Sequence, residues 1–412
     1  KQVTVEDLDP QIAKDYLGGT GLSAKITYDM LSEEDYEKLK KDPYDEKNPL
    51  IFATGPVTGT IRPSSGRYSA TGISPLTGIW GEGTSGGFFC ISLHKSGYDA
   101  LVFTGKAEKP IYFYIQDQGK IQFKDATSLW GKDTYSTQGE IKKELDNERV
   151  KIACVGPAGE NLVRYASIAN DDGRVVGRTG MGALMASKNL KAIAIHGTNR
   201  IELANSELGK VLYKEYNKKM KENFLSLALH HVFNMYGTNC YLDIGMTQGD
   251  TPAYYFTESE FLAEKVTGKT IKEQFPQDIV GCAGCALKCG KATYIEIDGE
   301  QIRVDGPEYE SVASLGPTVG LFETKPIIYA SHKFNQYGMD TISGGVSIGF
   351  LIYLVENNIG TDNIKEHLED IKLEEVKWGN EDLILQLTDK IAKREGIGNL
   401  LAEGVKRMAE IL

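Results

Sequence analysis

Three cysteines stand close together in the second half of the chain, in the stretch GCAGCALKCG. They are Cys282, Cys285 and Cys289, and they make up half of the six cysteines among the 412 residues. Thiolates at such spacing are typical of metal ligands, although a tetrahedral metal or a cubane cluster takes four ligands. No fourth ligand follows locally. A dense triplet with one distant partner favours an iron–sulfur cluster, with zinc and unliganded thiols as the alternatives.

Two further cysteines, Cys90 and Cys154, lie in apolar runs that are typical of strands. Free cysteine is among the most buried residue types and packs like a small apolar side chain. The sequence therefore predicts that both are core thiols rather than ligands.

Three glycine-rich stretches in the first half of the chain are suited to holding an anion. They are SSGRYS at 64–69, GEGTSGGF at 81–88 and NDDGRVVGRTGMG at 170–182. Glycine lets backbone N–H groups converge on a charged oxygen, and arginine adds a bidentate fork that matches phosphate. Composition alone nevertheless favours the simpler interpretation, in which these are strand turns with surface arginines.

Two glutamates, Glu308 and Glu310, follow a turn in the stretch RVDGPEYESVASLGPTVG and lead into an apolar helix. One of them is expected to be a carboxylate at the start of the helix. The other is a candidate for a buried acid–base group beside the metal region.

The elements that must position these residues change character near residue 200. Before it, glycine-rich turns alternate with short β-branched or aromatic runs, including a hairpin over 110–123. After it, the helical period dominates. The sequence predicts an α+β protein with a β-rich N-terminal domain over 1–200 and a mostly helical region over 201–412. Further strands are expected over 150–156 and 190–198, and helices over 136–146, 206–224, 324–338, 381–396 and 396–412.

Composition argues against several classes of protein. A hydrophobic content of 41% and a charged content of 25% are typical of a soluble globular protein. The net charge of -11 argues against general nucleic-acid binding, and the longest apolar stretch, 344–355, is too short to span a bilayer. Ordinary cysteine usage favours a reducing compartment, so a cytoplasmic location without membrane or nucleic-acid partners is expected.

Longer stretches of the sequence resemble the tungsten-dependent aldehyde ferredoxin oxidoreductase family. The resemblance covers essentially the whole chain and implies that it is cut at both ends, with the C-terminal third of a family member absent. The stretches that carry it, besides the cysteine triplet, are IFATGPVTGT, GRYSATGISPLTG, SGGFF, VGPAGENLVRYASIANDDGRVVGRTGMGALMASKNLKAIA, GPEYES, YGMDTIS and REGIGNLLAEG.

The resemblance implies two pyranopterin dithiolene cofactors, whose sulfurs hold the tungsten, on a base formed by the N-terminal domain. The residues that it places against the pterins and their Mg²⁺-bridged phosphates are Arg67, Thr84, Gly86, Arg174, Val175, Gly177 and Arg178. A second pterin contact is implied at Asn335, Met339 and Asp340, with Asn335 in place of the family's aspartate. The cysteine triplet would ligate a 4Fe–4S cluster, with the fourth cysteine in the absent C-terminal part.

The activity that the resemblance implies is oxidation of a small aldehyde to a carboxylic acid, with electrons leaving through the cluster to ferredoxin or another electron-transfer subunit. Glu310 is the implied acid–base residue, and the intact GPEYES favours this branch over the benzoyl-CoA reductases. The alternatives are a benzoyl-CoA reductase subunit, a sugar-aldehyde oxidoreductase or a non-catalytic pterin-binding fragment. A homodimer is compatible with the resemblance. Tyr329 replaces a glutamate that some members pair with His332 at a metal on the dimer axis, so that metal is not expected.

Overall fold

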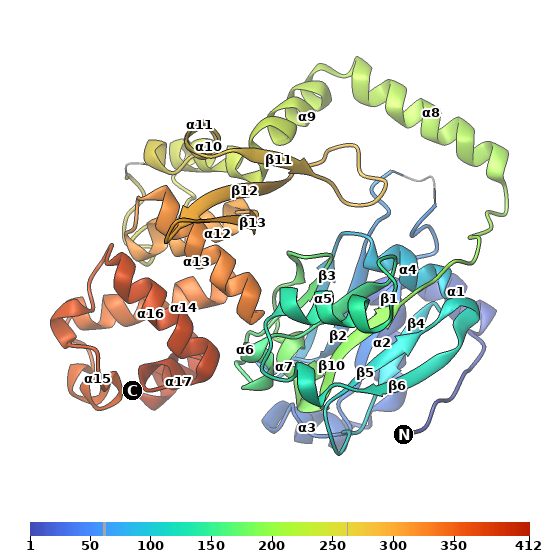
Figure 1. The fold of residues 1–412 in the computed structure, drawn as a ribbon, viewed down its shortest axis with the longest axis horizontal. Helices are drawn as coiled ribbons and strands as arrows, with labels where there is room; N and C mark the ends of the chain where they lie inside the picture. Colours follow the sequence, from blue (N-terminus) through green and yellow to red (C-terminus); the bar gives the residue numbers. More distant parts are fainter. Residues whose placement is uncertain (61–62, 262) are drawn as a thin grey trace. The chain divides into compact units, whose positions relative to one another are not determined.

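The computed structural model describes residues 1–60, 63–261 and 263–412. Over these residues the chain forms two compact units (Figure 1). Unit 1 consists of Lys1–Asn223 together with Cys282–Ala286, and unit 2 consists of Phe224–Gly281 together with Leu287–Leu412. The division expected at residue 200 stays a prediction about the folding domains.

Unit 1 is built on two β-sheets. The antiparallel four-stranded sheet has the order β3-β2-β1-β4, with β1 Leu50–Thr54, β2 Tyr68–Ile73, β3 Trp80–Ser85 and β4 Ala100–Phe103. The six-stranded sheet has the order β6-β5-β10-β7-β8-β9, and only its β5–β10 pair is parallel among the described strands. Its strands are β5 Ile111–Ile115, β6 Ile121–Asp125, β7 Lys151–Cys154, β8 Ile168–Asn170, β9 Arg174–Val176 and β10 Leu190–Ile195.

One apolar core lies between these two sheets. Phe52 of β1 meets Phe103 of β4 edge-on at a ring-centroid distance of 6.0 Å, and Phe103 meets Phe113 of β5 at 5.2 Å. Strands β1 and β10 are buried at every position, which explains why both are mostly apolar without regular polar alternation, apart from Thr54 at the end of β1 and Lys191 in β10. The helices of unit 1 are α1 Pro10–Tyr16, α2 Gly19–Met30, α3 Glu33–Lys41, α4 Phe89–Lys95, α5 Thr134–Glu144, α6 Pro157–Glu160, α7 Met181–Ser187 and α8 Ser206–Glu222.

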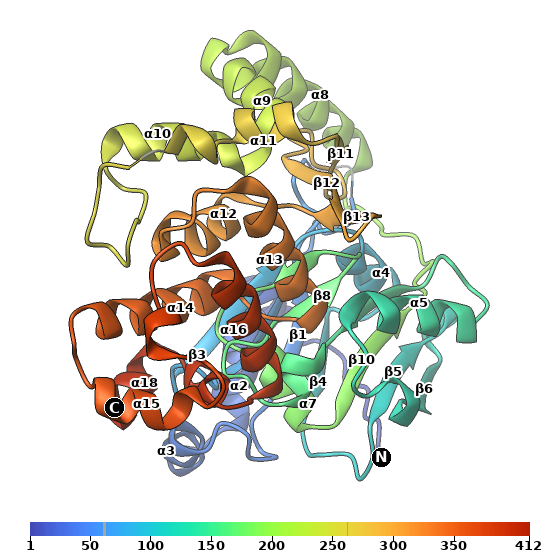
Figure 2. The same cartoon turned by 60° about the vertical axis from the view of Figure 1, so that its left-hand side comes forward.

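Unit 2 is mostly helical and contains a small antiparallel sheet of order β11-β12-β13. Helices α12, α13, α14 and α16 pack together, as Figure 2 shows. The strands are β11 Gln277–Val280, β12 Gly290–Ile297 and β13 Glu300–Asp305. The helices are α9 Phe224–Tyr236, α10 Cys240–Gln248, α11 Gly268–Gln274, α12 Tyr309–Leu315, α13 Thr324–Tyr337, α14 Thr341–Glu356, α15 Thr361–Leu368, α16 Glu381–Lys393, α17 Ile397–Leu401 and α18 Val405–Ile411.

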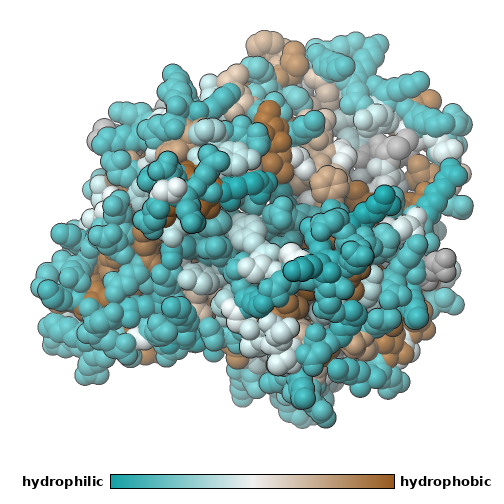
Figure 3. All heavy atoms as spheres, viewed as in Figure 1, coloured by the Kyte–Doolittle hydropathy of each residue, from teal (hydrophilic) through white to brown (hydrophobic). Residues whose placement is uncertain are grey.

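Hydrophilic side chains dominate the face of the protein drawn in Figure 3, as expected for a net charge of -11. Helix α8 is an exception within unit 1, because its Leu208, Val211 and Leu212 are all exposed. Within the described parts of the chain, every helix falls short of the length and apolarity that crossing a bilayer requires.

The predicted α+β class is confirmed, and so is the hairpin, which consists of β5 and β6 around a short turn at Asp117–Gly119. Two expectations are wrong. The apolar run around Cys90 is the helix α4 rather than a strand, and the helix expected over 396–412 is broken into α17 and α18, where Gly404 takes a positive φ of 80°. The sheet β11–β13 was not expected in the helical region.

A buried ion pair joins the six-stranded sheet to α6. The side chains of Lys191 in β10 and Glu160 are 0% and 5% exposed, and their charged atoms lie 2.5 Å apart. Lys191 Nζ also donates to the carbonyl of Lys132 at 2.8 Å, and the Gly131 N–H donates to Glu160 at 2.6 Å. Burial raises the pKa of Glu160, while the positive charge of Lys191 opposes that shift. Removing either residue would therefore leave the other as a buried charge without its partner.

We predict that Lys191→Met destabilises unit 1 by about 3–5 kcal/mol, because it leaves the buried carboxylate of Glu160 without its cation. The measurement is the unfolding transition of the variant in guanidinium chloride. Lys38→Met is the control, because Lys38 pairs with Glu34 at the surface, and it should leave the transition nearly unchanged. Equal effects of the two substitutions would contradict the role of the buried pair.

Candidate metal and cofactor site

The loop that carries Cys282 and Cys285 is part of unit 1 and is held by backbone hydrogen bonds. The Ala283 N–H donates to the Gly87 carbonyl at 3.2 Å, and the Ser64 N–H donates to the Gly284 carbonyl at 3.1 Å. Within the loop, the Cys285 N–H donates to the Cys282 carbonyl at 3.2 Å, which closes a tight turn between the two cysteines. Both are half-buried free thiols.

Glycine is required where this loop meets the rest of unit 1. A Cβ on Gly86 would lie 2.5 Å from Cys282 Sγ, and a Cβ on Gly66 would collide with the Ala283 carbonyl oxygen. Real Cβ atoms do not approach heavy atoms this closely, so a side chain at either position would push the cysteine loop away. Thiolates are the ligands of iron–sulfur clusters, so the two seated sulfurs fit part of such a ligand set.

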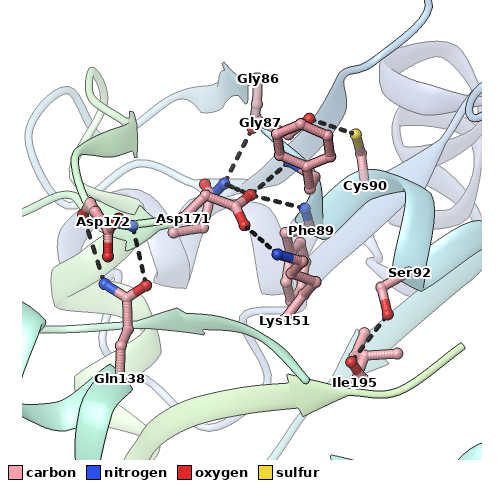
Figure 4. A network of polar contacts seen from close by, with 12 residues as sticks. Gly86, Gly87, Phe89, Cys90, Ser92, Gln138, Lys151, Asp171, Asp172 and Ile195 are labelled. Atoms are coloured by element: carbon pink, nitrogen blue, oxygen red, sulfur yellow. Dashed lines mark hydrogen bonds and ion pairs between the residues drawn. The ribbon is translucent and has the colours of Figure 1, made fainter. Parts of the chain in front are cut away.

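Hydrogen bonds to Asp171 fix the turn at Gly86 and Gly87 (Figure 4). Asp171 Oδ2 accepts hydrogen bonds from the N–H groups of Phe88 at 2.5 Å and Phe89 at 2.8 Å. Lys151 Nζ lies 3.6 Å from Asp171 Oδ1, so the carboxylate, which is 11% exposed, has a nearby positive charge.

Asn170, the residue before this carboxylate, ties the same turn to the sheet. Its Nδ2 donates to the Gly86 carbonyl at 3.0 Å, and its Oδ1 accepts from Tyr68 and Ser85 at 2.9 and 2.7 Å. Sequence reasoning missed Asn170 and Asp171 as individual residues. The signal that could have found them is the cluster Asn-Asp-Asp-Gly, which is typical of a turn whose side chains bind nearby backbone.

The glycine and arginine stretches that were expected to hold a phosphate converge within unit 1. Arg67 is exposed, and its Nη1 donates to Thr84 Oγ1 at 3.1 Å across the β2–β3 pair. A Cβ on Gly83 would lie 2.5 Å from Val176 Cγ1 and 3.5 Å from the Arg178 carbonyl oxygen, so β3 and the segment after β9 approach each other closely.

The structure thus brings most of the predicted pterin contacts of unit 1 into neighbouring elements. Thr84 lies in β3 and Gly86 directly follows it, while Arg174 and Val175 belong to β9. Gly177 and Arg178 follow β9, and Arg178 is exposed. Exposed or half-buried guanidinium groups beside glycine turns fit the chemistry of phosphate binding.

The other predicted site residues belong to unit 2. Cys289 is half-buried and directly precedes β12. Asn335 Nδ2 donates to the Asp305 carbonyl at 3.1 Å. Met339 is buried, and the carboxylate of Asp340 caps α14 by accepting from the N–H groups of Ile342 and Ser343 at 3.2 and 3.1 Å. Their roles toward a pterin or a cluster stay predictions. In the portion of the chain that the structure describes, no three His, Cys, Asp or Glu side chains are grouped to hold a metal ion.

The two glutamates lie at the start of α12, but the one proposed as a buried acid–base group is the more exposed of the two. Glu308 is half-buried, and Thr238 Oγ1 donates to its Oε2 at 2.6 Å while accepting from the Tyr309 N–H at 2.8 Å. Glu310 lies in the first turn of α12, and its side chain is exposed, so the expected burial of Glu310 is wrong. Thr238 was missed because nothing in the sequence links it to a glutamate 70 positions away.

Cys90 and Cys154 are core thiols, as predicted. Both are 0% exposed, and burial raises the pKa of each thiol to about 12. A thiol with so high a pKa stays protonated at neutral pH and is a poor metal ligand.

Family models match both parts of the chain. The model described as the N-terminal domain of aldehyde ferredoxin oxidoreductase matches residues 1–197. The model described as domains 2 and 3 of aldehyde ferredoxin oxidoreductase matches residues 212–412.

The sequence is also similar to longer proteins over nearly all of this chain. It is 38% identical to a tungsten-containing aldehyde ferredoxin oxidoreductase of Pyrococcus furiosus, over 99% of this chain and 65% of that protein. It therefore spans about 65% of the length of this relative. It is 30% identical to the aliphatic sulfonate oxidoreductase, WOR-like subunit, of the same organism, over 99% of this chain and 65% of that protein.

Among solved structures, the chain resembles the active site complex BamBC of benzoyl coenzyme A reductase in complex with 1,5-dienoyl-CoA. The TM-score is 0.81 at 28% sequence identity, covering 98% of this chain and 60% of that chain. This likeness supports the α+β fold of the described residues.

We predict that Asp171→Ala lowers the free energy of unfolding of unit 1 by about 3 kcal/mol, because two backbone N–H groups lose a charged acceptor. It should also speed alkylation of Cys282 under native conditions, since the turn that seats this cysteine is released. The measurements are the melting temperature and the rate of iodoacetamide labelling by mass spectrometry.

Asp172→Ala is the matched control for this variant. Asp171 and Asp172 both have a positive φ, of 44° and 67°, so replacing either by alanine carries a similar backbone cost. Asp172 is exposed, and its side chain should contribute little. If the two variants melt and label alike, the effect belongs to the backbone and not to the carboxylate.

Proposed function

Because this chain belongs to the tungsten-containing aldehyde ferredoxin oxidoreductase family, we propose that it oxidises aldehydes to carboxylic acids as part of a ferredoxin-linked enzyme. The observation that carries the proposal is the seating of the Cys282–Cys285 loop on Gly66 and Gly86, next to Arg67 and Thr84. One small region of unit 1 thereby presents both thiol ligands and a guanidinium group. These are the two kinds of group that a cluster and a phosphate-bearing pterin require.

The proposed cofactors are a tungsten bis-pyranopterin, with Mg²⁺ bridging its phosphates, and a 4Fe–4S cluster. When bound, the tungsten centre supplies the two-electron redox chemistry, and the protein supplies binding, orientation and proton transfer. Arg67, Arg174 and Arg178 would hold the phosphates by charged, bidentate hydrogen bonds. The remaining proposed contacts in unit 1 are Thr84, Gly86, Val175 and Gly177.

Three residues of unit 2 are proposed pterin contacts. Asn335 is half-buried, whereas Met339 and Asp340 are only 2% and 5% exposed, so Asn335 has the most accessible side chain of the three. Asp340 already caps α14, so it would act by fixing the start of that helix. Cys289 is proposed as the third cysteine ligand of the cluster, beside Cys282 and Cys285. Electrons would leave one at a time to ferredoxin or another electron-transfer partner in the cytoplasm.

Glu310 is the proposed proton-transferring residue, and its position follows from its neighbours. The Thr238 hydroxyl bridges Glu308 and the Tyr309 N–H, which fixes the first residues of α12. Glu310 follows directly, and Ser314 Oγ donates to its backbone carbonyl at 2.6 Å. The exposed carboxylate can therefore exchange a proton with water or substrate from a fixed backbone position.

A second candidate function is the reduction of an aromatic acyl-CoA. The TM-score of 0.81 to the benzoyl coenzyme A reductase complex favours it. The higher identity of 38% to an aldehyde ferredoxin oxidoreductase favours aldehyde oxidation. Assaying the anaerobically purified protein with aldehydes and with benzoyl-CoA separates the two, and activity toward benzoyl-CoA alone would overturn the first proposal.

We predict about four iron and four labile sulfide per chain in the anaerobically purified protein, together with tungsten. Cys285→Ser should lose the iron and the reduction of ferredoxin together, because an alcohol replaces a thiolate ligand. Cys90→Ser, which alters a core thiol, is the control and should keep its iron. Wild-type iron content in Cys285→Ser would contradict the cluster assignment.

We predict that Glu310→Gln lowers aldehyde turnover by about 10²–10⁴-fold with normal tungsten and iron, because the amide keeps the shape but cannot exchange a proton. The measurement is steady-state oxidation with metal analysis. Glu308→Gln is the control, since its amide oxygen can still accept from Thr238, and it should cost little. A larger loss in Glu308→Gln than in Glu310→Gln would reverse the assignment.

A further inference from the structure

Ser64 contacts the cysteine loop through both its backbone and its side chain. Its N–H donates to the Gly284 carbonyl at 3.1 Å. Its hydroxyl oxygen lies 3.9 Å from Cys285 Sγ, within hydrogen-bonding reach of a sulfur acceptor. The backbone bond therefore holds the hydroxyl beside this sulfur.

The backbone of Ser64 has a conformation that is uncommon for its residue type. Its φ is +56°, in the left-handed region that favours glycine and tolerates asparagine better than serine. A glycine at this position would relieve the strain but would remove the hydroxyl. Serine therefore occupies position 64 although the backbone conformation there would favour glycine.

We propose that Ser64 is a positioning residue that donates a hydrogen bond to the sulfur of Cys285 and thereby raises the reduction potential of the cluster ligated there. This inference rests on the proposed function, because it takes Cys285 to be a cluster ligand. It adds a residue that neither the cysteine spacing nor the family resemblance identified.

The physical reason is the charge that the cluster gains on reduction. One added electron increases the negative charge shared by the ligand sulfurs, so a hydrogen bond to one of them strengthens in the reduced state. Hydrogen bonds to the sulfurs and solvent exposure are among the factors that set the potentials of iron–sulfur clusters. Loss of the Ser64 hydroxyl should therefore favour the oxidised cluster.

The test is an EPR-monitored redox titration of the anaerobically purified holoenzyme carrying Ser64→Gly, Ser64→Ala or Ser64→Asn. In the glycine and alanine variants, the ratio of reduced to oxidised cluster at a fixed potential should fall by about twofold to fivefold, because only the part of one ordinary hydrogen bond that is gained on reduction shifts this ratio. Ser64→Asn retains a donor and tolerates the left-handed backbone, so it should recover part of the loss. Iron content should equal that of the wild type in all three.

The comparison of glycine with alanine separates the hydroxyl from the backbone. If Ser64→Gly keeps the wild-type potential while Ser64→Ala shifts it, the effect comes from backbone strain and the inference is overturned. An unchanged potential in both variants, with a normal cluster, also overturns it while leaving the proposed function intact. Wild-type protein without iron would overturn the proposed function, and this inference with it.

Discussion

The contact on which the rest of the candidate site depends is the approach of Cys282 to the backbone of Gly86. A single methyl group on Gly86 would stand 2.5 Å from the cysteine sulfur, so the loop can seat only where the chain has no side chain. The same constraint recurs at Gly66 beneath Ala283. Two glycines far from the cysteine loop in sequence therefore determine where Cys282 and Ala283 can pack. The loop belongs to unit 1, although the residues on both sides of it belong to unit 2.

The turn at Gly86 and Gly87 needs contacts from outside to fix its conformation, because glycine is the residue with the most conformational freedom. Asp171 and Asn170 remove that freedom by binding the N–H and C=O groups of residues 86–89. The price is a left-handed backbone at Asp171, with φ of 44°. Strain of this kind persists where surrounding structure over-determines it, and here four side-chain and ionic contacts do so.

The sequence was sufficient for those parts of the molecule in which local pattern and tertiary environment agree. The alternation around Asp117–Gly119 predicted the β5–β6 hairpin, and the helical period predicted α13 and α16. It failed at Cys90, because a short apolar run fits a buried helix as well as a strand. It also could not show that Glu308 rather than Glu310 is half-buried, since that depends on Thr238, which the fold brings from a distant segment.

The segment from Ser64 to Arg67 connects a residue beside the cysteine loop with an arginine that is proposed to bind phosphate. Ser64 and Gly66 meet the cysteine loop, while Arg67, the next residue, donates to Thr84. Three peptide steps span at most about 11 Å between Cα atoms. An anion bound by Arg67 and a cluster ligated by Cys285, as proposed above, would therefore be tied to the same short piece of backbone. Any displacement of this piece would move both groups together, so its rigidity, and not only its side chains, would affect the distance between the proposed pterin and the proposed cluster.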